Sequence, residues 1–175
     1  MNREMKLLWL APVAALYAAP ACATTYFTVA QAQANFFPGQ TLTAVDVVLT
    51  AEQAKMIEKR SATQVREPNL KVWRARDGGW FYVDRVIGKH EFITYAVALS
   101  EDGAVRAIEI LDYRETYGSE VRNPKWRAQF VGKRMGAALK LDADIVNLSG
   151  ATLSCRNVAA GVRRVLHTHA IVVAR

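Results

Sequence analysis

The sequence contains little cysteine and histidine, and it lacks the motifs of several common enzyme classes. Its 175 residues include two cysteines and three histidines. His90, His167 and His169 share no metal-ligand spacing with acidic residues or with cysteine, which argues against a metal centre. There is no Gly-x-Gly-x-x-Gly segment and no phosphate-loop lysine, so the corresponding nucleotide-binding folds are not expected. No Gly-x-Ser-x-Gly elbow points to a serine hydrolase, although a Ser-His-Asp site without that elbow stays open.

The residues that are present have the composition of an ordinary globular protein. Hydrophobic residues make up 51% of the chain and charged residues 22%, which is typical of a folded domain. The length supports one domain, and neither an internal repeat nor a low-complexity tract interrupts it. We therefore expect a single folded unit over residues 24–175, with its core at about 70–170.

Residues 1–23 have the pattern of an export signal. A basic start is followed by the apolar run Leu7–Ala19 and by Ala21-Cys22-Ala23, which resembles a signal-cleavage site, so cleavage is expected before Thr24. Two other interpretations rank below cleavage. They are an uncleaved membrane anchor, which the apolar run is barely long enough to form, and lipidation at Cys22. All three place the folded part outside the cytoplasm.

The chain is basic, with a formal net charge of +7. Cleavage removes Arg3, Lys6 and Glu4, so two basic residues and one acidic residue are lost and the charge becomes 7 − 1 = +6. This excess favours acidic partners or a membrane surface, whereas nucleic acid is not an expected partner of an exported protein. Cleavage also leaves Cys155 as the single cysteine, which excludes an intramolecular disulfide and favours a packing role for the thiol.

Helix signals precede a β-rich region. Residues 28–35 predict a short helix and residues 41–49 an extended stretch. Thr50 and Gln53 fit a capping box, which predicts a helix that runs to about Arg60.

Four strands are expected next, each bounded by turn residues. They cover residues 70–75, 80–87, 91–99 and 104–113. Simple alternation along the last strand places Leu111 and Tyr113 on one face and Ile108 and Ile110 on the other. Because both faces carry apolar residues, the sheet is expected to be covered on both sides, at least in part. The predicted fold class is α+β, an antiparallel β meander packed with helices.

Two helices are expected among the remaining segments. Residues 123–130 predict a helix with proline in its first turn. Residues 154–167 predict an amphipathic helix, because apolar residues recur there at helical spacing. The apolar residues 170–174 read as a strand-like tail.

A small, hydroxyl-rich turn, Ser149-Gly150-Ala151-Thr152, leads into that amphipathic helix. The start of a helix presents free N–H groups and a partial positive charge, which suit a phosphate. Gly150 would let an anion approach the main chain closely. The alternative is that Ser149 or Thr152 only caps the helix, and on these residues alone that alternative is the stronger.

The segment Ser149–Ser154 resembles the flavin-attachment sequence of the FMN-binding domain family. That family includes the FMN-carrying subunits of the sodium-pumping quinone reductase and of the Rnf electron-transport complex. The resemblance implies that Thr152 takes the phosphate of FMN as a phosphoester, installed by a flavin transferase that uses FAD as donor. Val146 stands where the family pattern usually has aspartate.

An upstream segment, Glu115–Glu120, resembles the Glu-Thr-Pro-Gly-Leu-Gly loop that helps to wall the flavin in that family. Tyr117 stands in place of the proline. The resemblance implies that Thr116 hydrogen-bonds a ribityl hydroxyl or a flavin edge, that Glu115 accepts from the ring N–H or braces the loop, and that Tyr117 stacks on the ring. Taken without the resemblance, the segment reads as a polar loop with a tyrosine packed underneath.

The resemblance implies an exported flavoprotein that relays electrons between redox partner proteins of the cell envelope. It would lie in the periplasm or on the outer face of the cytoplasmic membrane, with membrane association as a further expectation, and would not be an enzyme on its own. Two alternatives remain open: a non-covalent FMN-binding reductase, and a flavin-free binding or adaptor domain. The expected FMN-binding residues are Ser149, Gly150, Ala151, Thr152, Leu153, Ser154, Glu115, Thr116, Tyr117 and Gly118.

Overall fold

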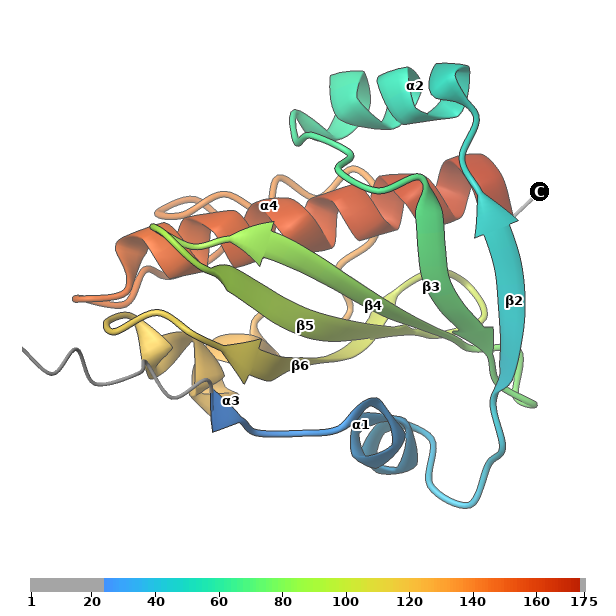
Figure 1. Ribbon diagram of the computed structural model, residues 1–175, viewed down its shortest axis with the longest axis horizontal. Coiled ribbons are helices and arrows are strands. Elements are labelled where there is room, and N and C mark those ends of the chain that lie inside the picture. Colours follow the sequence, from blue (N-terminus) through green and yellow to red (C-terminus); the bar gives the residue numbers. More distant parts are fainter. Residues whose placement is uncertain (1–23, 174–175) are drawn as a thin grey trace, which may run out of the picture.

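The structure is a computed structural model that describes residues 24–173, so the predicted export signal lies outside the described residues. A six-stranded antiparallel sheet has the order β1-β6-β5-β4-β3-β2 (Figure 1). Its strands are β1 Thr24–Thr25, β2 Thr43–Val48, β3 Asn69–Arg74, β4 Trp80–Ile87, β5 Phe92–Leu99 and β6 Val105–Tyr113. Strands β2 to β6 form a meander of consecutive antiparallel neighbours, which confirms the predicted fold class.

Helices cover both faces of the sheet (Figure 1). They are α1 Val29–Phe36, α2 Ala51–Ser61, the 3₁₀ helix η1 Ser119–Arg122, α3 Pro124–Ala128, α4 Thr152–Thr168 and the π-helical turn η2 His169–Val173. The capping box predicted at Thr50 and Gln53 is present with both of its hydrogen bonds. No helix among the described residues is long and apolar enough to span a membrane.

The main core lies between the sheet and α4. The apolar residues predicted along this helix are all buried, and they are Cys155, Val158, Ala159, Val162, Val165 and Leu166. On the opposite face a smaller core forms under α1, where Phe37, Phe81 and Leu111 pack together. Coverage of both faces was predicted from the apolar residues of the strands, and the structure confirms it.

An irregularity in β6 makes the predicted alternation wrong at Tyr113. Thr94 of β5 pairs with Asp112 and Tyr95 pairs with Ile110, so Leu111 is an extra residue in the ladder. A β-bulge of this kind shifts the following side chains to the other face. Leu111 lies opposite Ile110, in the core under α1, as alternation predicts, whereas Tyr113 joins Ile110 in the core beside α4.

The predicted strand-like tail is also wrong, because the described chain continues from α4 as the turn η2. Ile171 is buried against Leu49 and Ile57 in a third cluster, which includes the apolar face of α2. A short apolar run fits a buried helical turn as well as a strand. In the structure this run is a helical turn packed against α2.

Two side chains of α4, Asn157 and Arg164, hold the helix against β4 and the residue that follows it. Asn157 donates to the carbonyl oxygens of Ile87 and Gly88 at 2.7 and 3.1 Å. Two turns later, Arg164 donates through Nη2 to Asp84 Oδ2 at 2.6 Å and to the Arg85 carbonyl at 3.0 Å. These bonds fix the helix along its length, and therefore fix the place where it begins.

Acidification is expected to weaken the fold through His169. Its Nδ1 lies 2.8 Å from the Tyr82 hydroxyl, and burial lowers its pKa from 6.5. Since the unfolded chain then binds the proton more readily, the free energy of unfolding should fall as the pH drops below about 6.5. Urea titrations between pH 7.5 and 5 should show this slope. It should be smaller in His169→Gln; an equal slope in the wild-type protein and this variant would contradict the assignment.

Candidate functional site

The hydroxyl-rich turn Ser149–Thr152 leads directly into α4, and its last residue is the first residue of the helix. Helix α4 begins at the same end of the molecule at which β6 ends (Figure 1). Thr152 begins the helix, and the residue before it, Ala151, provides no side-chain cap. The interpretation of Ser149 or Thr152 as a cap is therefore wrong. Among the described residues, the main-chain N–H groups of Thr152, Leu153 and Ser154 have no hydrogen-bond acceptor. Free donors at a helix start can hold an anion.

The Thr152 hydroxyl has one neighbour that holds it in place. Asn147 donates through Nδ2 to Thr152 Oγ1 at 3.1 Å, while its own Oδ1 is buried and without a partner among the described residues. The preceding residue, Val146, is fixed at both of its main-chain groups. Its carbonyl accepts from Trp126 Nε1 at 2.9 Å, and its N–H donates to Gln129 Oε1 at 2.7 Å. The loop that presents Thr152 is thus attached to α3.

Tyr113 contacts both segments that were predicted from sequence to form the site, Glu115–Gly118 and Ser149–Ser154. Its hydroxyl contacts the Tyr117 carbonyl and lies 2.9 Å from Ser154 Oγ. Gly118 has a positive φ of 93°, and a Cβ there would lie 2.7 Å from Ser154 Oγ and 3.5 Å from the Ala151 Cα. Only glycine allows this approach. The two segments are therefore neighbours in the fold.

Glu115 braces the turn between β4 and β5, a contact between distant segments that the sequence did not predict. Its Oε1 accepts from the main-chain N–H groups of Lys89, His90 and Glu91. Burial acts to raise the pKa of Glu115, but these hydrogen bonds outweigh it, and the pKa lies below its usual range. A Cβ at Gly88 would lie 2.5 Å from Oε1, so the glycine makes room for the carboxylate.

The other predicted site residues differ in how far they are exposed to solvent. Tyr117 is 84% exposed and Leu153 is 43% exposed, whereas Ala151 and Ser154 are buried. Thr152 is half-buried, and Ser149, Gly150 and Thr116 are exposed. Because Tyr117 faces solvent, the alternative of a tyrosine packed under the loop is wrong. Its ring is free to stack on a flat ligand.

Residues 88–167 match the family model described as the FMN-binding domain. This segment belongs to the FMN-binding domain family. No curated protein matches the chain. The assignment implies FMN as cofactor and a flavin-binding role in electron transfer. The matched segment includes both Glu115–Gly118 and Ser149–Ser154.

The residues of this FMN-binding domain suit a phosphate ester at Thr152. The hydroxyl stands at a helix start whose N–H groups have no acceptors among the described residues. Gly150 has a positive φ of 84°, and no heavy atom lies within 4 Å of the place where its Cβ would be. A phosphodiester keeps one negative charge, which free N–H groups and the helix dipole stabilise. No group of acidic, histidine or cysteine residues that could hold a metal occurs among residues 24–173.

Sequence reasoning missed two residues of the site, Tyr113 and Asn147. Alternation placed Tyr113 with Leu111, away from α4, because a bulge leaves no clear sign in the sequence. Asn147 could have been found from the sequence, because it is a polar side chain only five residues before Thr152 and so within reach of its hydroxyl. Cys155 is fully buried, and burial raises the pKa of its thiol. The thiol therefore packs, as predicted.

Replacing Glu115 with alanine is expected to destabilise the domain by about 1–3 kcal/mol, because three main-chain N–H groups lose their acceptor. Thermal or urea unfolding measures this loss. Glu91→Ala is the matched control, since Glu91 is an exposed carboxylate on the same turn with no side-chain hydrogen bond among the described residues. An equal effect of the two substitutions would argue against the bracing role.

Proposed function

We propose that the protein is an exported flavoprotein that carries FMN as a phosphoester on Thr152 and relays electrons between redox proteins of the cell envelope. The observation that carries the proposal is the Thr152 hydroxyl, held by Asn147 at a helix start without side-chain capping, inside a segment of the FMN-binding domain family. Bound FMN supplies one- and two-electron chemistry. The domain supplies binding, orientation and access for partners.

Attachment requires a flavin transferase and FAD. The Thr152 oxygen forms the new bond to the phosphorus of the FMN half of FAD, the anhydride bond breaks, and AMP leaves. The hydroxyl proton passes to a base of the transferase. Asn147 donates to Oγ1 rather than accepting from it, so its hydrogen bond persists when that oxygen becomes an ester.

Exposure of the site supports a relay. Tyr117 and Leu153 are open to solvent on either side of the junction that Tyr113 makes. A cofactor held there would be accessible to a partner protein. Tethering would prevent the loss of FMN outside the cytoplasm.

The sequence of residues 1–23 supports export, since it has the charge and apolar pattern of a signal segment. The structure is compatible with cleavage before Thr24, because the main chain at Thr24 already pairs with Tyr113 in the sheet. An uncleaved anchor would hold the domain on the outer face of the membrane instead.

One observation favours a second candidate, non-covalent FMN binding. Val146 occupies the position where the family pattern usually has aspartate, and it is 67% exposed. A transferase that needs a carboxylate there would leave Thr152 unmodified. The domain would then hold FMN through its N–H groups and loop contacts alone.

The test compares protein exported from a host that has the flavin transferase with protein from the same host lacking it. The proposal expects yellow protein only in the first case, with flavin absorbance that stays with the polypeptide after acid precipitation. Flavin that washes away on denaturation supports the second candidate. Protein that is colourless and ignores added FMN would contradict both.

Asn147→Ala is expected to slow flavin attachment by ~2–10-fold, the equivalent of one hydrogen bond of about 0.5–1.5 kcal/mol. The reason is that the Thr152 hydroxyl loses the contact that orients it. The measurement is the initial rate of FMN incorporation into the apo-protein by transferase and FAD. Asn157→Ala serves as the control, because it removes another hydrogen-bonding asparagine, one that holds α4 on β4. If both variants slow attachment equally, Asn147 has no specific positioning role.

A further inference from the structure

The sheet opens between β3 and β4, away from the Thr152 site. The two strands pair from Arg74↔Trp80 to Lys71↔Val83. Beyond that point β3 continues with β2 alone to Asn69, and β4 continues with β5 alone to Ile87. Figure 1 shows the two strands diverging toward α4.

A pocket of about 210 Å³ occupies this opening. Its lining combines six apolar residues with nine polar or charged ones, from β3, β4, β5, α4 and the segments that flank α2. The apolar lining residues are Leu49, Val65, Leu70, Tyr82, Val83 and Val165. The volume is below the ~300–1,000 Å³ of pockets for drug-sized ligands, so a ligand here is smaller than FMN. Val165 lies 13 residues after Thr152 on α4, which is about 20 Å along the helix.

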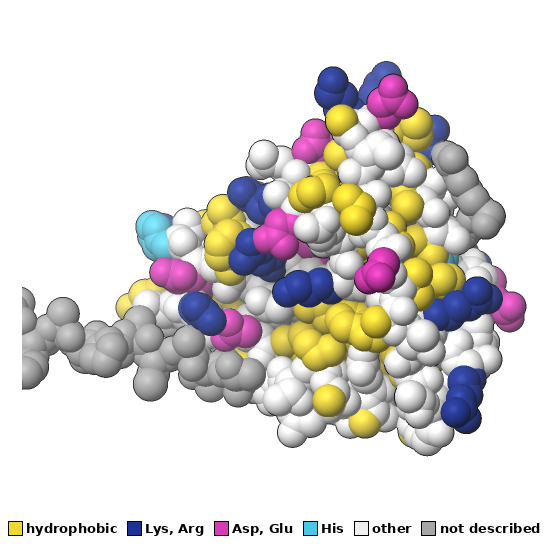
Figure 2. Space-filling view, turned by 45° about the vertical axis from the view of Figure 1, so that its right-hand side comes forward, with side chains coloured by type: hydrophobic (Ala, Val, Ile, Leu, Met, Phe, Trp, Pro, Cys, Tyr) yellow, Lys and Arg dark blue, Asp and Glu magenta, His cyan; other side chains and the backbone are white. Residues whose placement is uncertain are grey.

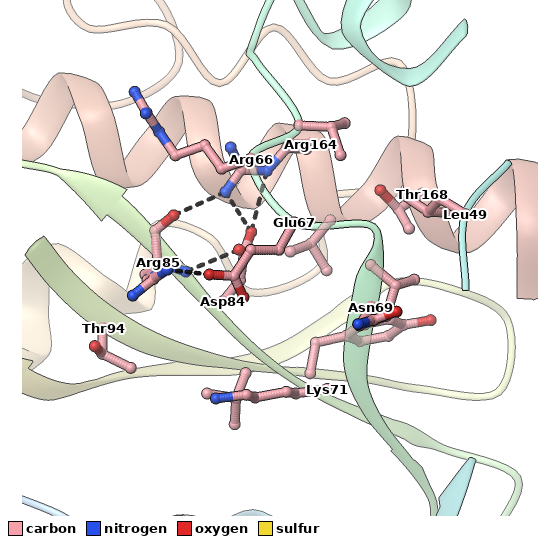
Figure 3. Close-up of a pocket in the computed structure, with 15 residues that line it drawn as sticks. Leu49, Arg66, Glu67, Asn69, Lys71, Asp84, Arg85, Thr94, Arg164 and Thr168 are labelled. Carbon is pink, nitrogen blue, oxygen red and sulfur yellow. Dashed lines mark hydrogen bonds and ion pairs between the residues drawn. The ribbon is translucent and has the colours of Figure 1, made fainter. Parts of the chain in front are cut away.

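A rigid ionic network forms one side of the pocket (Figure 3). Asp84 Oδ2 accepts from Arg164 Nε at 3.1 Å, from Arg164 Nη2 at 2.6 Å and from the Tyr95 hydroxyl at 2.8 Å. Arg164 is only 6% exposed. Beside it, Arg85 pairs with Glu67. These contacts neutralise both acidic groups that line the pocket and hold the wall in shape.

Two further cations of the lining, Arg66 and Lys71, have no ion pair among the described residues. Three polar side chains of the lining, those of Asn69, Thr94 and Thr168, make no hydrogen bond there either. Figure 3 shows Lys71 and Thr168 on different sides of the opening. The pocket therefore has an excess of two positive charges together with free hydrogen-bond donors. On the face shown in Figure 2, Lys and Arg side chains lie beside Asp and Glu side chains, so the charge is mixed rather than uniformly basic.

We propose that this pocket is a second ligand site, for a small anion such as a carboxylate carried on a compact apolar body. The apolar lining residues would bury the body, and the two cations without ion pairs, Arg66 and Lys71, would attract the acidic group. A neutral ligand of the same shape would leave the two cations unpaired. This site is independent of flavin attachment, because none of its lining residues belongs to the segments that surround Thr152.

The test is a titration of the ¹⁵N-labelled protein with benzoate, and separately with benzamide, followed by amide chemical shifts. Benzoate should shift the amides of residues 65–71, 83–85 and 164–168 and should bind at least several-fold more tightly than its neutral analogue. Shifts confined to other residues, or equal affinity for the two probes, would overturn the proposal.

Two variants that each remove one positive charge distinguish a direct contact with benzoate from an effect of the protein's net charge. Lys71→Gln is expected to raise the Kd for benzoate ~3–5-fold, as an exposed charge contact of under 1 kcal/mol does. Lys55→Gln, on the exposed side of α2, should leave the Kd unchanged. Equal weakening by both variants would mean that benzoate responds only to net charge, and the site would be rejected.

Discussion

Replacing Thr152 with alanine is expected to abolish covalent FMN attachment completely. The side-chain oxygen is the atom that forms the phosphoester, and alanine has none. Asn147 would lose its hydrogen-bond partner, but the fold should persist because Thr152 is only half-buried and makes no other side-chain hydrogen bond among the described residues. Mass spectrometry of the protein co-expressed with the transferase measures the result.

A further variant makes this prediction specific. Thr152→Ser keeps a hydroxyl at the same atom and should retain attachment. Peptide mapping of this variant should place the flavin on residue 152. If Thr152→Ala still carries covalent flavin, or if mapping places the flavin on another residue, then the assigned oxygen is the wrong one.

Replacing Gly161 with alanine is expected to destabilise the protein by about 1–3 kcal/mol or more, the usual cost of overpacking a core. A Cβ there would lie 2.3 Å from the Tyr95 hydroxyl and 2.7 Å from Val86 Cγ1. Both side chains are buried in the main core. At an exposed helical position the same substitution would stabilise by up to about 1 kcal/mol, so the sign of the effect is diagnostic. Urea denaturation measures it.

A double-mutant cycle tests the cause of that loss. Tyr95→Phe removes the nearest atom, so Gly161→Ala should be less costly in that background. The relief should be partial, because Val86 Cγ1 and the ring carbon Tyr95 Cζ at 2.8 Å remain close. An identical cost in both backgrounds would show that the hydroxyl is not what the new methyl group meets. A stabilising Gly161→Ala would show that α4 does not lie this close to the sheet.

The close approach at Gly161 matters for function as well as for stability. Together with Asn157 and Arg164, it holds α4 on β4 and β5. The first turn of the same helix presents Thr152. A helix pushed outward at Gly161 would therefore move the attachment residue relative to Tyr113, even though the two positions are nine residues apart in the chain.

Local sequence patterns predicted the elements that depend on neighbouring residues. The box of Thr50 and Gln53 predicted the start of α2, and turn residues around Trp80 and Ile87 gave the bounds of β4. The apolar spacing after Thr152 predicted α4, although the helix starts two residues earlier than the expected Ser154. These signals lie within a few residues of what they determine.

Features that depend on distant residues were not predictable in this way. The bulge at Leu111 is set by the pairing of β6 with β5, and it turns Tyr113 toward Ser154. Glu115 meets residues 89–91 only because β5 and β6 bring them together. The opening between β3 and β4 likewise depends on where these two strands stop pairing with each other. That point is set by the pairing of distant segments and cannot be predicted from one stretch of sequence.

The most direct test is the intact mass of the wild-type protein, exported by a host that has the flavin transferase. We expect a chain that begins at Thr24 and carries the added mass of one FMN phosphoester, located by peptide mapping to the segment that contains Thr152. A bare chain, with no change in flavin absorbance when free FMN is titrated into it, would contradict the account.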